Sequence, residues 1–181
     1  MVRTMESLMR ALLVVLAILA PSLAHALDVP PRKAGLWEMT MTFEGRNLPQ
    51  QHIKQCIDAA TDKMMNSLGG QMGKEACAQQ NVQQTAGSIV VDSTCKIGGG
   101  TIVSHAVVTG DFNSAYTVTV DSKHEGAMAP GMPAGGETKM VVGAKWLGPC
   151  AADQKPGDMI LGGGIKMNIK NLPTLNGMPM R

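Results

Sequence analysis

Two cysteines that flank a hairpin-like stretch constrain the fold of this chain more than any other feature. Two runs of residues typical of strands, 77–85 and 88–95, are separated by a short loop that contains a glycine, and such a loop is typical of a β-hairpin. If Ala86 lies at the centre of the loop, Cys77 and Cys95 face each other directly, at a separation that a disulfide can bridge. A slip of one residue in this hairpin would instead leave the two cysteines to pair elsewhere.

The cysteine count extends this reasoning to a second bridge. The chain has four cysteines, and an even number is typical of a disulfide framework in an exported protein. If Cys77 bonds to Cys95, elimination pairs Cys56 with Cys150, which would join an early strand end to a late one. No two cysteines have the Cys-x-x-Cys spacing, so neither a thioredoxin-type redox site nor a typical zinc site is indicated.

Residues 1–26 have the pattern of a secretory signal peptide. Arg3 and Arg10 provide a positive start, residues 11–20 form a continuous apolar run, and a small-x-small cleavage site ends at Ala26. The apolar run is shorter than the about 20 residues that a membrane-spanning helix needs, although an uncleaved anchor is the alternative. We therefore expect a periplasmic or secreted protein whose mature chain has no transmembrane segment.

Apolar and polar residues alternate with a period of two along several segments, which is typical of half-buried strands. The clearest alternation starts at Trp37, within residues 35–43. One helix is expected at 58–68, capped at its start by Asp58 or Thr61 and ended by a pair of glycines. Further strands are expected at 50–56, 77–85, 88–95, 101–109, 115–122 and 137–147.

This order of elements predicts a mainly β fold. Short connections between successive strands favour an antiparallel meander, and strands with one apolar face must curl or pack on another layer to bury that face. We therefore expect residues 27–157 to form a curved sheet or partly closed barrel with one short helix and two disulfides. Residues 158–181 are expected to be a loosely ordered C-terminal tail, with a short strand near 165–169.

Strand pairing suggests which residues face the interior of this sheet. A turn centred on Phe112 and Asn113 would place Val107 opposite Val118 on one apolar face. In the same register, His105 would be a polar group within that apolar face. A histidine in such a position is more typical of a satisfied core residue than of a catalyst.

Aromatic residues extend the same candidate wall. Trp37 and Trp146 each stand at one end of an alternating segment, and we expect both to be buried on the same side of the sheet. Tyr116 lies on the apolar face of its own segment. The candidate ligand-binding residues are therefore His105, Val107, Tyr116, Trp37 and Trp146.

Composition argues against several classes of function. Nucleic-acid binding is disfavoured because the chain has no basic cluster and only two tryptophans, one tyrosine and two phenylalanines. The mature chain has three scattered histidines, His52, His105 and His124, and no Gly-x-Ser-x-Gly elbow, while its cysteines are assigned to disulfides. We therefore expect a protein that is not an enzyme and has no cofactor.

Several short motifs occur in a characteristic order. Gly35-Leu36-Trp37-Glu38 opens the domain, Cys56-Ile57-Asp58 precedes the helix, and Trp146-Leu147-Gly148-Pro149-Cys150 follows the cysteines of the hairpin. Over residues 33–157 the chain resembles a bacterial exported family catalogued as domain of unknown function 3617. This resemblance implies a periplasmic or secreted, cysteine-stapled domain, and it assigns no catalytic residue because the family has no assigned reaction.

Two functional classes follow. The first is a non-enzymatic binding or envelope-associated protein whose curved sheet holds a hydrophobic small molecule or an envelope protein, because the apolar strand faces exceed what one helix can cover. A sheet that closes on itself and fills its interior with side chains is the alternative. The second class is a copper-binding protein, because the chain has 15 methionines and their thioethers select Cu(I). Its candidate ligands are His124, Met128 and Met132. Core packing, where methionine fills gaps, explains Met39, Met41, Met64, Met65 and Met140.

Overall fold

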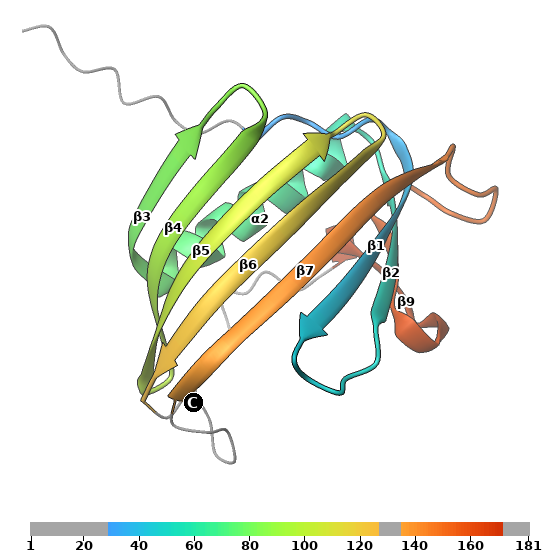
Figure 1. Cartoon of the computed structure of the whole chain (residues 1–181). Coiled ribbons are helices and arrows are strands. Elements are labelled where there is room, and N and C mark those ends of the chain that lie inside the picture. The colour runs from blue at the N-terminus through green and yellow to red at the C-terminus, as the bar shows by residue number, and fades with distance from the viewer. Residues whose placement is uncertain (1–28, 127–134, 172–181) are drawn as a thin grey trace, which may run out of the picture.

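The computed structural model describes residues 29–126 and 135–171. Within them the chain forms one open sheet of nine antiparallel strands and one α-helix, α2 (Figure 1). This arrangement confirms the predicted mainly β fold with an antiparallel sheet. The segment predicted to be a signal peptide, 1–26, lies outside the described residues. The strands are β1 (Gly35–Glu44), β2 (Gln51–Ile57), β3 (Cys77–Gln84), β4 (Ser88–Ile97), β5 (Gly100–Asp111), β6 (Ala115–Glu125), β7 (Gly135–Gly148), β8 (Asp158–Ile160) and β9 (Lys166–Asn168).

The strands lie in the order β3-β4-β5-β6-β7-β1-β2-β8-β9. β3 to β7 follow one another as the predicted meander, whereas the hairpin β1–β2 lies between β7 and β8. Residues 158–171 differ from the expected loosely ordered tail, because β8 pairs with β2 and β9 pairs with β8 at one edge of the sheet. The short strand expected near 165–169 corresponds to β9. β8 has three residues, too few for a period of two to be recognised in the sequence.

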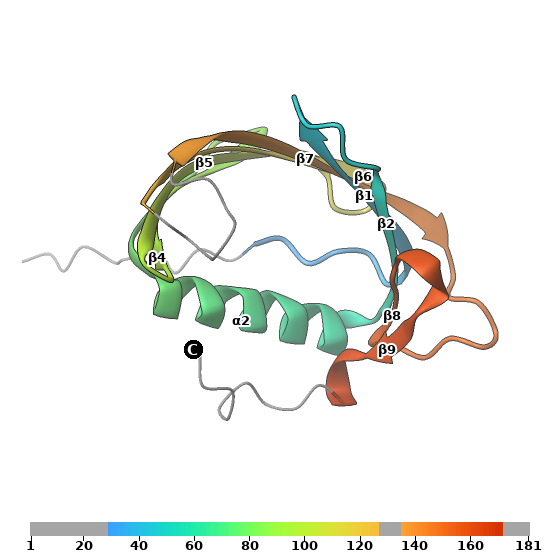
Figure 2. The ribbon, with the colours of Figure 1, turned by 90° about the horizontal axis from the view of Figure 1, so that it is seen from below.

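The helix α2 (Ala59–Ala76) crosses the concave face of the sheet, as Figure 2 shows. It has 18 residues and continues through Gly69 and Gly70, where the sequence predicted its end. The strands that it connects, β2 and β3, are six positions apart in the sheet, which corresponds to about 29 Å at about 4.8 Å per strand. A helix of this length spans about 27 Å. The distance across the sheet, rather than the local preference of glycine, therefore accounts for the length of the helix.

Both predicted disulfides are present, and they flank α2. Cys56 lies near the end of β2, just before the helix, and bonds to Cys150, which follows β7. Cys77 is the residue at which the helix ends, and it bonds to Cys95 on β4. The helix is therefore linked covalently to the sheet at both of its ends.

The β3–β4 hairpin brings its two cysteines together through a register that differs from the predicted one. Near the turn, Gln84 pairs with Ile89, one residue out of the predicted register. A β-bulge between Cys77 and Gln79 absorbs the extra residue and brings Cys77 opposite Cys95. The slip that would have separated the cysteines does occur, and the bulge cancels it.

The β5–β6 turn also shifts the pairing by one residue. Three residues, 112–114, separate the two strands, so that Val107 pairs with Thr119 and His105 pairs with Asp121, rather than with the predicted valines. Side chains alternate between the faces of a sheet, so a shift of one residue reverses which face a position occupies. Val107 and His105 lie on the convex face, and their predicted placement in an apolar wall is wrong.

The best-packed part of the core surrounds Trp37. Its side chain is fully buried and packs with Ile57 and Ala144. Trp146 is the direct partner of Trp37 in the β1–β7 pairing, so the two tryptophans lie on the same side of the sheet, as predicted. Trp146 is half-buried rather than buried. The core is therefore concentrated where β1, β2 and β7 meet.

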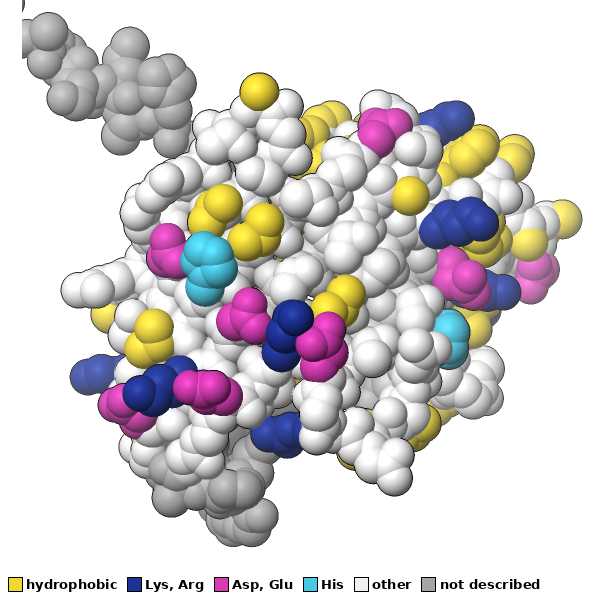
Figure 3. Space-filling view, in the orientation of Figure 1, with side chains coloured by type: hydrophobic (Ala, Val, Ile, Leu, Met, Phe, Trp, Pro, Cys, Tyr) yellow, Lys and Arg dark blue, Asp and Glu magenta, His cyan; other side chains and the backbone are white. Residues whose placement is uncertain are grey.

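The convex face has a different character. Side chains of both charges and polar groups surround separate apolar side chains on it (Figure 3). Ion pairs such as Lys139–Glu44, with 3.0 Å between nitrogen and oxygen, are exposed to water and contribute little to stability. Among the described residues, no helix is long and apolar enough to cross a membrane.

Candidate binding groove

A groove of about 420 Å³ lies between the concave face of the sheet and α2. Its sheet wall is made of alternate residues on neighbouring strands. Ile89 of β4 pairs with Val108 of β5, which pairs with Val118 of β6, and all three line the groove. Side chains of directly paired residues share one face. Alternation therefore produces a continuous apolar wall, with a volume in the range of small-molecule sites.

The segment 29–34, which precedes β1, and the helix form the other side of the groove. This lead-in segment runs between the sheet and α2 (Figure 2). The backbone N–H of Lys33 donates a hydrogen bond to the carbonyl of Phe112 at 2.9 Å, which ties the segment to the β5–β6 turn. Pro30 of this segment and Met65 of α2 line the groove. Because proline resists both helix and sheet pairing, the lead-in stays extended and separates the two layers.

A buried ion pair stands at the start of α2. The Nε of Arg32 donates to Asp62 Oδ1 at 2.8 Å, and the backbone N–H of Arg32 donates to Asp62 Oδ2 at 2.8 Å. The two side chains are 8% and 1% exposed. Arg32 Nη1 also donates to Gln55 Oε1 at 2.9 Å, while Nη2 donates to the sulfur of Met65 at 3.6 Å. Arg32 and Gln55 both line the groove, as does Asn66 of α2, so part of a mostly apolar lining is polar.

Most of the apolar lining is incompletely covered. Ile89 and Ile169 are buried, at 6% and 7% exposure. The remaining apolar lining residues are half-buried or exposed. The helix therefore leaves part of the concave apolar face accessible, as the excess of apolar strand faces in the sequence suggested.

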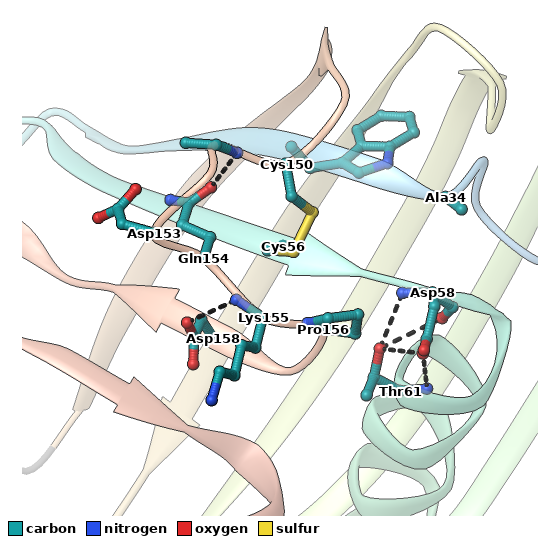
Figure 4. Close-up of a disulfide and its surroundings, with 12 residues drawn as sticks. Ala34, Cys56, Asp58, Thr61, Cys150, Asp153, Gln154, Lys155, Pro156 and Asp158 are labelled. Atoms are coloured by element: carbon teal, nitrogen blue, oxygen red, sulfur yellow. Dashed lines mark hydrogen bonds between the residues drawn. A yellow bond between two sulfur atoms is a disulfide. The ribbon is translucent and has the colours of Figure 1, made fainter.

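The start of α2 is fixed by several interactions that Figure 4 shows together. The Cys56–Cys150 disulfide precedes it. Asp58 is the N-cap: its carboxylate accepts from the backbone N–H of Thr61 at 2.8 Å, and the Thr61 hydroxyl accepts from the backbone N–H of Asp58 at 2.9 Å. This reciprocal pair satisfies backbone donors that a helix start leaves free. It also confirms Asp58 as one of the two predicted caps.

Asp158 holds the chain that follows Cys150. Its carboxylate accepts hydrogen bonds from the backbone N–H of Lys155 at 2.9 Å and from Asn168 Nδ2 at 2.8 Å, and Lys166 Nζ lies 3.0 Å away. These interactions, with the Lys155 bond the largest, lower the pKa of Asp158 from 3.8 to about 2. Asp158 is buried, which by itself would favour the neutral acid, but these hydrogen bonds keep the carboxylate ionised, and it anchors β8 and β9 beside the groove.

Of the five residues predicted for the wall, Tyr116 lines the groove. Its ring stacks on Phe112, with 4.7 Å between centroids, and lies 5.6 Å from the ring of Trp37. Trp37 and Trp146 belong to the adjacent core. The structure therefore gathers three of the five on one side of the sheet.

The other two predicted residues, His105 and Val107, lie on the convex face. His105 Nδ1 is 2.6 Å from Asp92 Oδ1, and its side chain is 53% exposed. The histidine thus belongs to a surface pair with its cross-strand neighbour on β4. Neither residue contributes to the groove.

Of the three candidate copper ligands, the described residues include His124. Met128 and Met132 lie outside them. His124 is half-buried on β6, and its Nε2 is 2.9 Å from the hydroxyl of Thr138. Within 29–126 and 135–171, no group of three or more His, Cys, Asp or Glu side chains could hold a metal ion.

The sequence reasoning missed Arg32 and Asp62. They are 30 residues apart, one in the irregular lead-in and the other in the first turn of the helix. The available signal was an acidic residue near a helix start, which the helix dipole alone would explain. No local pattern indicates that a distant arginine pairs with it.

The fold and the groove define a class of protein: an antiparallel, disulfide-linked curved sheet with an apolar groove beneath a single helix. The chain belongs to a family described as protein of unknown function (DUF3617), whose family model matches residues 32–150. This match confirms the resemblance noted from the cysteines and tryptophans. A search of curated proteins and a search of solved structures each found no match. The function is therefore inferred from the geometry of the groove.

Proposed function

We propose that this protein is a non-enzymatic binding protein that holds an apolar small molecule in the groove between the sheet and α2. One observation carries the proposal: the apolar wall around Val108 and Val118 faces a volume of about 420 Å³, and the helix leaves most of this wall incompletely covered. A concave, largely apolar space with a few polar groups is the usual form of a small-molecule site.

The proposal places the protein in the periplasm or outside the cell. Its four cysteines form two disulfides, which fit a non-cytoplasmic protein because such bonds persist in oxidising compartments. The pattern of a signal peptide at 1–26 supports the same location.

Two neighbouring valines on β5 provide a matched test. Val108 lines the groove, whereas Val107 faces the opposite side of the sheet. The full chain, with its disulfides intact, is titrated with Nile red, an apolar dye whose emission reports its surroundings. Saturable binding is expected. Val108→Trp should fill the groove and weaken binding at least about tenfold, which is about 1.4 kcal/mol, while Val107→Trp should bind like the unmodified protein.

The two variants also define the contrary outcomes. Binding that occurs only after the disulfides are reduced would show that the native interior does not admit the dye. Equal effects of both tryptophans would place the dye elsewhere on the molecule. Either result would remove the support for a ligand carrier.

A further inference from the structure

We propose that the ligand is an amphiphile with one alkyl chain and an uncharged hydrogen-bond acceptor, such as an ester carbonyl, and that Arg32 binds this acceptor. The inference rests on the proposed function, because it assigns the chemistry of a ligand in the same groove.

Arg32 retains donor capacity inside the groove. A guanidinium has five N–H donors. Nε is used by Asp62, and Nη1 donates to Gln55. Nη2 has the sulfur of Met65 at 3.6 Å as its acceptor, and a thioether is a weak one. The side chain is 8% exposed, so bulk water does not readily supply a better partner.

An oxygen atom of a ligand would improve this arrangement. Arg32 and Met65 both line the groove, so a ligand acceptor that enters it can replace the sulfur as the partner of Nη2. A hydrogen bond from a charged donor to oxygen is among the stronger polar interactions in proteins. Its strength increases where water is excluded.

The charge on Asp62 decides which acceptor fits. Its carboxylate is 1% exposed and already neutralises Arg32 at 2.8 Å. A ligand carboxylate at Nη2 would place a second negative charge beside the same single cation, and taking an unbalanced charge out of water is unfavourable. An ester or ketone oxygen accepts the same hydrogen bond without this penalty. The site therefore favours an uncharged acceptor over a carboxylate.

The rest of the groove suits the alkyl chain. The polar contacts join the lead-in, β2 and α2, whereas the continuous apolar wall belongs to β4, β5 and β6. These strands lie on the other side of β7 and β1 in the sheet order. A ligand with its polar end at Arg32 can therefore lay its chain along Val108 and Val118.

The experiment measures how three chain-matched compounds compete with Nile red at neutral pH: methyl decanoate, decanoate and undecane. The unmodified protein should bind methyl decanoate about tenfold more tightly than undecane, because of one charge-assisted hydrogen bond. It should also prefer methyl decanoate to decanoate. Equal competition by the ester and undecane, or a preference for decanoate, would overturn the inference.

Two variants test the roles of the ion pair. Asp62→Asn leaves the guanidinium without its counter-charge, and decanoate should then overtake methyl decanoate. Replacing both partners, Arg32→Met with Asp62→Leu, avoids leaving a lone buried charge and should abolish the advantage of the ester over undecane. Lys139→Gln is the control, since Lys139 lies on the convex face, where its Nζ is 3.0 Å from Glu44. The selectivity of this variant should remain that of the unmodified protein.

Ratios between competitors separate the two proposals. Each ratio is taken within one variant, so a general change in groove affinity cancels. If the unmodified protein binds Nile red but does not distinguish the three compounds, the inference about Arg32 fails and the carrier stands. If it does not bind Nile red, both proposals fail. An unchanged order of competitors in Asp62→Asn would also overturn the role of the counter-charge.

Discussion

The two ends of α2 are attached to the sheet in different ways. At its start, a disulfide at Cys56, the reciprocal cap between Asp58 and Thr61, and the ion pair of Asp62 with Arg32 lie within a few residues of one another. Its second half passes through three glycines before it ends at Cys77, which is bonded to Cys95. Polar interactions are thus concentrated at the start of α2, beside the groove. A disulfide holds the other end of the helix.

Removing either disulfide is expected to have the largest effect on stability, and it tests the difference between the two ends of α2. Cys56–Cys150 spans 94 residues and Cys77–Cys95 spans 18. Because a longer closed loop restricts the unfolded chain more, loss of the first bridge should lower the free energy of unfolding by about 4.5 kcal/mol and loss of the second by about 3 kcal/mol. Double cysteine-to-alanine variants are compared by urea unfolding without reductant. A larger loss for the short bridge would contradict the ranking.

Asp158 provides a test of the region around the start of α2, because its contribution to stability depends on pH. It lies beside Gly157, whose N–H donates to the carbonyl of Cys56 at 2.8 Å. Its pKa of about 2, against 3.8, means that the folded state favours the ionised form. This contributes about 2 kcal/mol of stability above pH 4, which is lost as the pH falls from about 4 to about 2.

Asp158→Asn should therefore be less stable than the unmodified protein at pH 7 by about 2 kcal/mol, and the difference should shrink toward pH 2. Urea unfolding at a series of pH values measures both curves. A constant difference across this range would show that ionisation is not the source of the effect.

The smallest test concerns the glycines in the second half of the helix. Gly70 is exposed, and a side-chain carbon there would meet no atom within 4 Å. Gly70→Ala should raise the free energy of unfolding by about 0.5–1 kcal/mol, because alanine favours the helix. Asp58→Ala should act in the opposite direction by removing the N-cap. Thermal unfolding of both variants shows whether each change raises or lowers the stability. A destabilising alanine at Gly70 would show that the glycine is required there.

Local patterns were sufficient to predict strands β1 to β7 and both disulfides. The alternation from Trp37 and the loop between Cys77 and Cys95 are features of short segments, and they identify elements without reference to the rest of the chain. The length of α2 depends instead on the distance between β2 and β3. Local glycine preferences at Gly69 and Gly70 therefore predicted its end too early.

The candidate site depended on details that short patterns do not contain. One additional residue in the β5–β6 turn sends His105 and Val107 to the convex face. On β3 the predicted register was also wrong by one residue, but the bulge near Cys77 still places Cys77 opposite Cys95. Arg32 and Asp62 meet only because the lead-in crosses beneath the sheet, and neither residue belongs to a recognisable motif.

The pairing of β1 with β7 determines when the core can be completed as the chain elongates. The Trp146 side chain donates to the carbonyl of Ala34, 112 residues earlier. A chain that emerges from its N-terminal end presents β1 and β2 long before their remaining partner exists. Until β7 has emerged, Trp37 lacks its neighbour Ala144, and Cys56 lacks Cys150. The core around Trp37 therefore closes only once the chain as far as β7 is available to fold.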